Sequence, residues 1–513
     1  MAPYSSIFAG ALVVNVAATL RSSSYWNKCK HQFGFSPETG ESSEEVKPQE
    51  ASLKKELDAK HYSVLKRYLV VYLLAVLSDW LQGPYVYALY ETYGYSQHNI
   101  AILFVAGFGS SMIVGSFIGG LADSYGRRKF TILFAIIYAA SCATKHFKNF
   151  KVLMLGRLLG GVATSLLFST FDSWLIKAHA QAGVSSYLAK SFSIASYGNS
   201  TIAILAGLFA NKVASMNELK PAFDPIPQRA TFFMGGYLNP FDMALVALSL
   251  CGIFAALLWD ENYGIDNRDD SDKKEVSLYG GFKNAFFTTY NSTDILLTGI
   301  ICSLFEGSMY IFVFMWTPAM TNLTEGAAAG SLPFGLIFST FMVCSMAGSS
   351  LFSICVELVN CEKIGLGVFS SATVSFLFMA LSNSDTLTFL SFLLFEICVG
   401  CYFPMMGTMK SIIVPERKRA AIYNLYRIPL NLIVVMSLLT HLTPKQSFFL
   451  CTTMMGIATW LQVKLIRYQK TSMILHSSSA PPVISSDVEE FYKTLDSVVE
   501  EEESLAEPFI SQV

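Results

Sequence analysis

Apolar segments of about twenty residues recur along this chain of 513 residues, and they restrict its fold more than any other feature. A membrane-spanning helix needs about 20 consecutive apolar residues, whereas a strand of a membrane barrel needs about ten with strict alternation. The segments are long and do not alternate, so they predict helices. We expect twelve core spans, at about 66–88, 99–121, 129–145, 152–176, 188–211, 241–259, 294–317, 333–356, 364–382, 386–409, 420–441 and 446–466.

Composition agrees with this interpretation. Hydrophobic residues make up 52% of the chain and charged residues 14%, whereas soluble domains contain about 25% charged residues. The chain is therefore predicted to be an all-α polytopic membrane protein. The cysteines show no metal-ligand spacing, and no basic patch with interleaved aromatic residues suggests nucleic acid as a partner. No cofactor is expected.

Polar stretches divide the chain into parts. The long charged stretch at 260–292 separates six spans from six others, which predicts two six-helix bundles joined by a cytosolic loop. Residues 5–20 are apolar but short, and we interpret them as an additional N-terminal hydrophobic segment. The acidic end of the chain is typical of disorder, and a regulator could bind it. The expected division is an anchor at 1–24, a cytosolic linker at 25–64, bundles at 65–259 and 293–468 around the loop at 260–292, and a disordered cytosolic tail at 469–513.

Short cationic loops predict the orientation in the membrane, because lysine and arginine favour the cytoplasmic side. The loop at 127–129 and the loop at 416–419 both follow an even-numbered span, so both are placed inside. Lys145, Lys148 and Lys151 disagree, since they would lie outside. In this topology Asn322 belongs to an external glycosylation sequon.

The loop between the second and third spans has a specific pattern of residues. Glycines and an aspartate precede two arginines and a lysine, and glycine permits a tight turn and close helix approach. This pattern resembles the cytoplasmic signature loop of the major facilitator superfamily, although Ser124 stands where a cation is usual. The resemblance implies a latch that holds the cytoplasmic helix ends together in one state. Its residues would be Gly119, Asp123, Gly126, Arg127 and Arg128.

The two halves show weak internal similarity, which in transporters points to the binding site. The first span contains Gln82 followed by Gly-Pro and tyrosines, and the seventh contains Glu306 followed by glycine and aromatic residues. The fourth span begins its glycine-rich part at Gly160 and Gly161, and the tenth does so at Gly400. Together with the division into six and six spans, these matches favour two related bundles.

Arg427 is the strongest candidate for binding a ligand. It lies inside the eleventh span with Asn424 and Asn431 at i−3 and i+4, so the three share a helix face. A guanidinium beside amides offers only donors, which suits a tetrahedral oxyanion. Gln82 and Tyr85 of the first span are added as candidate ligands. The structural alternative is a buried ion pair of Arg427 with Glu306 or Glu396.

Four acids lie in expected spans, where an ionised group is costly. Asp79, Asp172, Glu306 and Glu396 could carry a coupling proton or balance the empty site. They could equally be structural partners of Arg157, Lys410 and Arg427. Arg157 opens the fourth span, and we assign it with Gly160 and Gly161 to helix packing.

Six segments, in order across both halves, resemble one family, the eukaryotic molybdate-anion transporters of the major facilitator superfamily. They are 79–85 (DWLQGPY), 156–161 (GRLLGG), 259–263 (WDENY), 314–318 (FMWTP), 400–404 (GCYFP) and 426–429 (YRIP). The resemblance implies uptake of molybdate across the plasma membrane by a secondary active transporter that works by alternating access.

Two other functions remain open from the residues alone. The chain could carry another small anion or an organic acid, or it could be a membrane sensor or scaffold that does not transport. An enzyme is not favoured, because no nucleophile–base group, metal spacing or phosphate loop stands out.

Overall fold

The structure, a computed structural model, describes residues 2–22, 48–115, 117–222, 231–263, 286–323, 332–415, 419–440 and 442–479. Nearly all of these residues are helical. In the first half of the chain the helices are α1 (Ala2–Ser22), α3 (Pro48–Gln82), α4 (Val86–Thr92), α5 (Gln97–Gly115), α6 (Ile118–Tyr125), α7 (Arg127–Thr144), α8 (Phe150–Gln181), α9 (Leu188–Ala214) and α10 (Asn239–Leu258). In the second half they are α12 (Thr293–Leu323), α13 (Phe334–Cys355), α14 (Cys361–Leu381), α15 (Asp385–Ile413), α16 (Arg419–Leu439) and α17 (Pro444–Ser479).

Short elements connect these helices. Three-residue 3₁₀ turns are η1 (Gly83–Tyr85), η2 (Ser185–Tyr187) and η3 (Gly236–Leu238). Strands β1 (Lys220–Pro221) and β2 (Phe233–Met234) pair antiparallel. Two long helices begin at side-chain caps: Asn149 accepts from the amides of Lys151 and Val152 at the start of α8, and Ser384 accepts from Leu387 at the start of α15.

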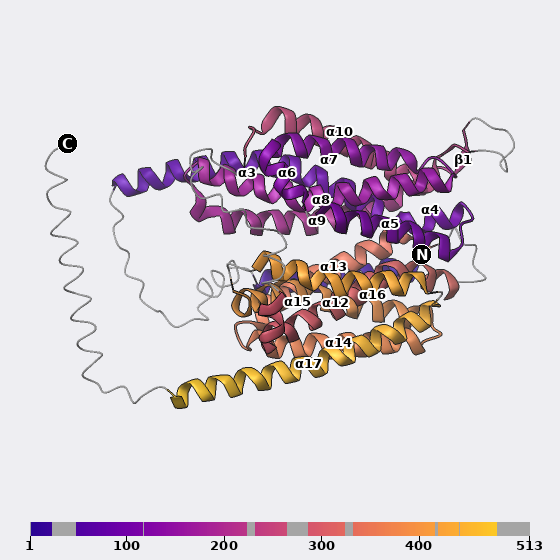
Figure 1. Cartoon of the computed structure of the whole chain (residues 1–513). Coiled ribbons are helices and arrows are strands. Elements are labelled where there is room, and N and C mark those ends of the chain that lie inside the picture. The colour runs from indigo at the N-terminus through magenta and orange to yellow at the C-terminus, as the bar shows by residue number, and fades with distance from the viewer. Residues whose placement is uncertain are drawn as a thin grey trace, which may run out of the picture. The chain divides into compact units, whose positions relative to one another are not determined.

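The helices form two groups that follow the order of the chain (Figure 1). In the first group α3 packs on α9 and α10, and α8 packs on α5 and α7. In the second group α15 packs on α13 and α14, and α12 packs on α16. The two groups meet mainly where α9 contacts α13 and where α5 contacts α16.

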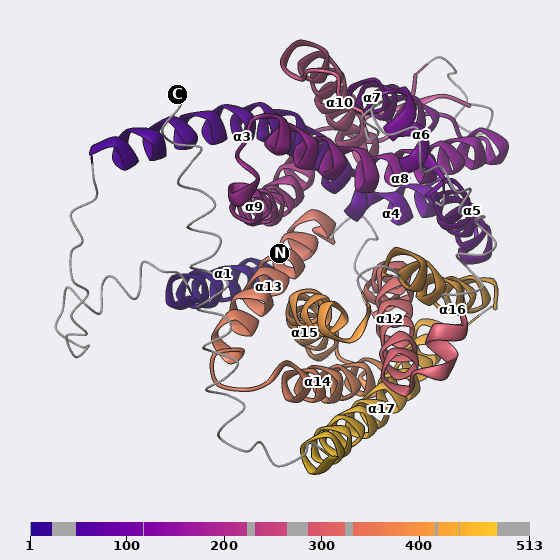
Figure 2. The same cartoon turned by 60° about the vertical axis from the view of Figure 1, so that its left-hand side comes forward.

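Helix α1 packs beside α13, which follows it by more than 300 residues (Figure 2). The Thr19 and Ser350 hydroxyls are 3.2 Å apart, and Asn15 is buried in the contact. The other side of α1 exposes apolar side chains such as Val13 and Val14. This pattern suits a helix that has a protein neighbour on one side and lipid on the other.

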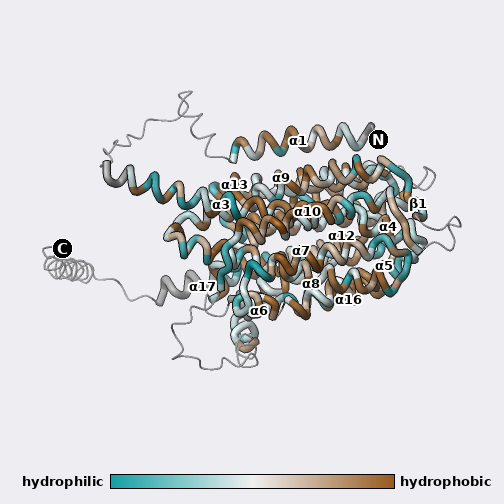
Figure 3. Tube along the Cα trace, turned by 90° about the horizontal axis from the view of Figure 1, so that it is seen from above, coloured by the Kyte–Doolittle hydropathy of each residue, from teal (hydrophilic) through white to brown (hydrophobic). Residues whose placement is uncertain are grey.

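Ten of the described helices are long and apolar enough to cross a membrane, α1 among them. The other three expected spans coincide with α3, α7 and α16, which include charged residues. In Figure 3 apolar residues predominate along the helix bodies, and the beginning of α3 is hydrophilic. The expected fold class, an all-α multi-pass membrane protein, is thus confirmed.

The structure differs from the expected element boundaries in three places. The second span breaks after Gly115 and resumes as α6 at Ile118. Helix α3 begins at Pro48, inside the expected cytosolic linker. Helix α17 continues to Ser479, because no proline or glycine interrupts it after Gly456. By contacts, residues 1–462 form one unit and residues 463–513 another; the acidic part of the tail lies outside the described residues.

Candidate functional site

Arg427 lies on α16 with its side chain exposed. Among the described residues it makes no hydrogen bond or ion pair, although its charge acts on Tyr310 of α12. Pro429 follows two positions later inside the same helix. A guanidinium in a spanning helix costs about 2.5–3.5 kcal/mol on insertion scales. Within the described residues, the donors of Arg427 are thus not engaged by another side chain or by a carbonyl.

Glu306 lies on α12, one helical turn from Tyr310, and is paired with Lys410 of α15. The carboxylate oxygen Oε1 is 3.7 Å from Lys410 Nζ. The same oxygen accepts from the Tyr402 hydroxyl at 3.0 Å and from the Cys302 thiol at 2.9 Å. Lys410, and not Arg427, is thus the partner of Glu306.

The other residues expected to bind the ligand lie elsewhere or remain undetermined. Gln82 donates to the Ser78 carbonyl in its own helix, and Tyr85 donates to Asn211 of α9 at 3.5 Å. Both are buried, and Tyr85 also packs against the Phe334 ring of α13. Asn431 is half-buried on α16, and the side chain of Asn424 lies outside the described part of the chain.

The three other acids occupy separate places. Asp79 accepts a hydrogen bond from Tyr138 of α7. Asp172 of α8 is exposed and accepts from Tyr68 at 3.5 Å. Glu396 is buried in α15, and within the described ranges it has no hydrogen bond or ion pair. The structure therefore does not gather the four acids into one cluster.

Arg157 extends from α8 to α5. Its Nε donates to the Leu103 carbonyl at 3.2 Å, and its guanidinium lies 4.3 Å from the centre of the Phe104 ring. On the same helix, a Cβ at Gly161 would overlap the Gly107 carbonyl of α5. Gly160 lies against Ser141 of α7. These residues bring α8 close to α5 and α7.

The loop between α6 and α7 is bonded within the first helix group. Arg127 forms an ion pair with Asp123 at 2.7 Å and donates to the Ser173 carbonyl. Arg128 donates to the Ala256 carbonyl. Gly126 has φ of +110°, which glycine tolerates. Of the expected latch residues, Gly119 lies near Ser169 of α8.

Sequence reasoning missed the partners that follow α10. Glu261 accepts from the backbone amide of Arg128 at 2.8 Å, at the beginning of α7. The Trp259 ring stacks on the Trp174 ring with centres 4.1 Å apart, and Asp260 pairs with Arg67 at 2.9 Å. The WDENY segment at 259–263 was part of the family resemblance, but nothing in it indicated the loop at 123–128 as its partner.

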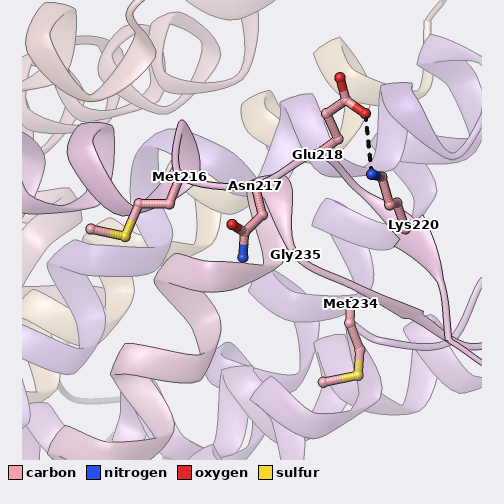
Figure 4. A pocket seen from close by; sticks show the side chains of 6 residues that line it. All are labelled: Met216, Asn217, Glu218, Lys220, Met234 and Gly235. Carbon is pink, nitrogen blue, oxygen red and sulfur yellow. Dashed lines mark ion pairs between the residues drawn. The ribbon is translucent and has the colours of Figure 1, made fainter.

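At the helix ends opposite the loop between α6 and α7, a small cavity of about 180 Å³ lies between α5, α12 and the α16–α17 connection. Gln97 donates there to the Leu442 carbonyl at 3.4 Å, and Asn322 is part of the lining. A wider hollow of about 490 Å³ lies beside β1 and β2 (Figure 4). Its Glu218 and Lys220 face each other at 3.6 Å and are exposed, so they neutralise one another.

Comparison with known proteins identifies relatives over most of the chain. Residues 48–388 match the family described as sugar transporters with twelve transmembrane segments. The molybdate-anion transporter of Xenopus tropicalis is 34% identical over 77% of this chain and 84% of its own length. That of Danio rerio is 31% identical over 73% of this chain and 78% of its own.

Solved structures share the fold at low identity. A bacterial homologue of the human lysosomal transporter Spinster superposes with a TM-score of 0.61 at 14% identity, over 80% of this chain and 97% of that one. A peptide transporter crystallised with sulfate gives 0.61 at 15% identity, over 80% and 94%. The fold and the sequence relatives agree, and the chain belongs to the molybdate-anion transporter family of the major facilitator superfamily.

Proposed function

We propose that this membrane transporter carries molybdate into the cell, with Arg427 as the main binding residue. The observation that carries the proposal is an exposed arginine in a spanning helix, without a partner among the described residues, in a chain whose relatives are named molybdate-anion transporters. Molybdate is a tetrahedral dianion with acceptors only, and a guanidinium offers five donors in a fixed geometry. Asn431, Asn424, Gln82 and Tyr85 remain candidate ligands.

Contacts between the two helix groups support transport by alternating access. They include the Tyr87–Phe314 and Phe104–Phe314 ring pairs, and the close approach of Gly207 to Gly335. All lie in the halves of the helices that the positive-inside rule places toward the outside. Contacts of this kind would close the outer side in one state, and their separation would open it in the other.

The loop at 119–128 would serve as a latch by keeping the cytoplasmic end of the first helix group rigid. Its bonds to Ser173, Ala256 and Glu261 tie α6–α7 to α8 and to the end of α10. A rigid group can then rotate as one body against the other. Changes in this loop should alter the rate of transport more than the affinity.

The test is molybdenum accumulation in cells that lack their own molybdate uptake, at trace external molybdate and with excess sulfate as competitor. The expected result is uptake that survives sulfate. Loss of uptake to sulfate would instead indicate a less selective anion transporter. No uptake by a chain confirmed at the cell surface would overturn the proposal.

The matched variants are Arg427→Gln and Lys54→Gln, which each remove one positive charge. Lys54 is exposed on the first turns of α3, so its loss should leave uptake unchanged. Arg427→Gln should abolish uptake with equal surface expression. Surface biotinylation in the same cells checks the proposed plasma-membrane location. Normal uptake by Arg427→Gln would remove the anion site from α16.

A further inference from the structure

The ion pair between Glu306 and Lys410 is loose. Its 3.7 Å separation exceeds the roughly 2.7–2.9 Å of a direct charge-assisted hydrogen bond. The carboxylate is held instead by two neutral donors, Tyr402 and Cys302. Both charged side chains remain partly exposed, at 22% for Glu306 and 18% for Lys410. Lys410 can therefore leave Glu306 without leaving the carboxylate bare.

Lys410 also lies next to the helix that carries Arg427. Its Nζ is 5.2 Å from the centre of the Tyr423 ring, and Tyr423 precedes Arg427 by four residues, so the two share a face of α16. Arg427 in turn acts on Tyr310, one turn after Glu306 on α12. Lys410 thus lies beside the carboxylate on α15, and Arg427 on α16 acts on a residue one turn away from it.

We propose that Lys410 is a second cation of the oxyanion site, and that Glu306 is paired with Lys410 while no anion is bound. This inference rests on the proposed function. A dianion bound to Arg427 and Lys410 is neutralised by them, and an ionised Glu306 would then leave one uncompensated negative charge. An uncompensated charge out of bulk water is costly. The neutral state is reached when Glu306 takes one proton from the water on the side from which the anion enters, forming its own O–H bond.

Among the residues that the structure describes, no other group beside Glu306 is suited to accept this proton. The titratable and charged groups around Glu306 are Cys302 and Tyr310 on α12, Tyr402 and Lys410 on α15, and Tyr423 and Arg427 on α16. Tyrosine and cysteine side chains are ordinarily neutral near pH 7, and lysine and arginine side chains ordinarily already carry their proton. Glu306 is therefore the group whose charge changes when the anion binds.

A purely structural ion pair is the competing explanation, and it predicts different behaviour. A structural pair needs only opposite charges, so exchanging them by Glu306→Lys with Lys410→Glu should preserve function. An anion site needs the cation on α15, beside Arg427. In the exchanged protein a carboxylate would stand at that place, and we expect it to repel the anion.

The experiment measures molybdate binding to the purified full-length protein in lipid nanodiscs by calorimetry, in two buffers of different ionisation enthalpy. The wild type is expected to take up one proton per molybdate. Glu306→Gln should bind molybdate without proton uptake, and more tightly near pH 7.5, because nothing competes for Lys410. Glu357→Gln, an exposed acid after α13, should bind as the wild type does.

The lysine is tested in the same assay. Lys410→Gln should bind at least about tenfold more weakly, the loss expected for one charged hydrogen bond, and Lys410→Arg should retain binding. Lys410→Arg and Glu306→Gln keep the test decisive if Lys410→Gln does not fold. Full binding by Lys410→Gln, or by the exchanged pair, overturns this inference while Arg427 keeps its role. A wild type that does not bind molybdate overturns the proposed function as well.

Discussion

The two helix groups use their charged residues differently. In the first group each arginine described above is occupied: Arg157 by a carbonyl and a ring, Arg127 by Asp123 and a carbonyl, Arg128 by a carbonyl. In the second group Arg427 has no partner in the described residues, and Lys410 has a distant one. Occupied cations hold helices in place, whereas free cations are available to a ligand. This contrast is the reason why we propose a scaffold role for the first group and anion binding for the second.

The packing of the two groups is nevertheless alike, and the largest expected effect tests that likeness. Gly161 of α8 and Gly400 of α15 each lie against a backbone carbonyl, on α5 and α13 respectively. Alanine at either place should force the helices apart and nearly abolish folded protein, since overpacking costs about 1–3 kcal/mol or more. Fluorescence-detected size exclusion measures this.

The matched control is Gly407→Ala on α15, where a Cβ would meet nothing within 4 Å. It should yield folded protein at the wild-type level. If Gly161→Ala were tolerated and Gly400→Ala were not, the two groups would not share this contact, and their likeness would be limited to helix order.

The second prediction separates the arginines by stability. Arg157→Gln should lower the midpoint of thermal unfolding, because it removes a charged hydrogen bond and a cation–π contact worth about 2 kcal/mol together. Arg427→Gln should leave the midpoint unchanged or raise it, because an unpaired charge in a spanning helix is unfavourable. Thermal unfolding in detergent gives both values. An equal decrease for the two variants would mean that Arg427 also holds the structure together.

The third prediction concerns the cytoplasmic end of the first group. Glu261 accepts from the first turn of α7, where a negative charge is favourable by about 0.3–2 kcal/mol. Glu261→Gln should therefore lower the unfolding midpoint slightly and slow uptake without changing the apparent affinity. Uptake kinetics over a range of molybdate concentrations test this. A changed affinity with an unchanged rate would count against the latch.

The smallest expected effect is a pH dependence at the beginning of α3. His61 is buried there, and its Nε2 is 2.9 Å from the Ser191 hydroxyl. Burial, followed by the nearby His179 and Lys190, lowers the pKa of His61 below its usual 6.5. The unfolded or undocked segment therefore binds more protons, and docking should weaken as the pH falls below about 6.5.

Hydrogen exchange of residues 48–65, the first part of α3, measures this docking. The rates are compared at pH 7.5 and 5.5 after correction for intrinsic exchange. Exchange should be faster at the lower pH. The difference should shrink in His61→Gln. An unchanged pH effect in that variant would assign it to another group.

Hydropathy and short motifs predicted the twelve spans and the family, because a spanning helix is visible in a continuous stretch of sequence. Arg427 also stood out, since an arginine within an apolar span is rare. Lys410 was named only as one of three possible structural partners of the acids, because a cation at the end of a span is typical of a topology signal. Its pairing with Glu306 depends on how α15 is rotated against α12, and Glu261 depends on a contact across 133 positions. Neither the Glu306–Lys410 pair nor the contact of Glu261 with Arg128 can be predicted from residues adjacent in sequence.

The contact between α1 and α13 has a consequence for biosynthesis. Thr19 and Ser350 are separated by 331 positions, and ribosomes add roughly 5–20 residues per second. The first helix is thus made on the order of 15–70 s before its neighbour exists. Throughout that interval its buried Asn15 must find water, lipid headgroups or a chaperone. The contact between α1 and α13 therefore forms only after α13 has been made.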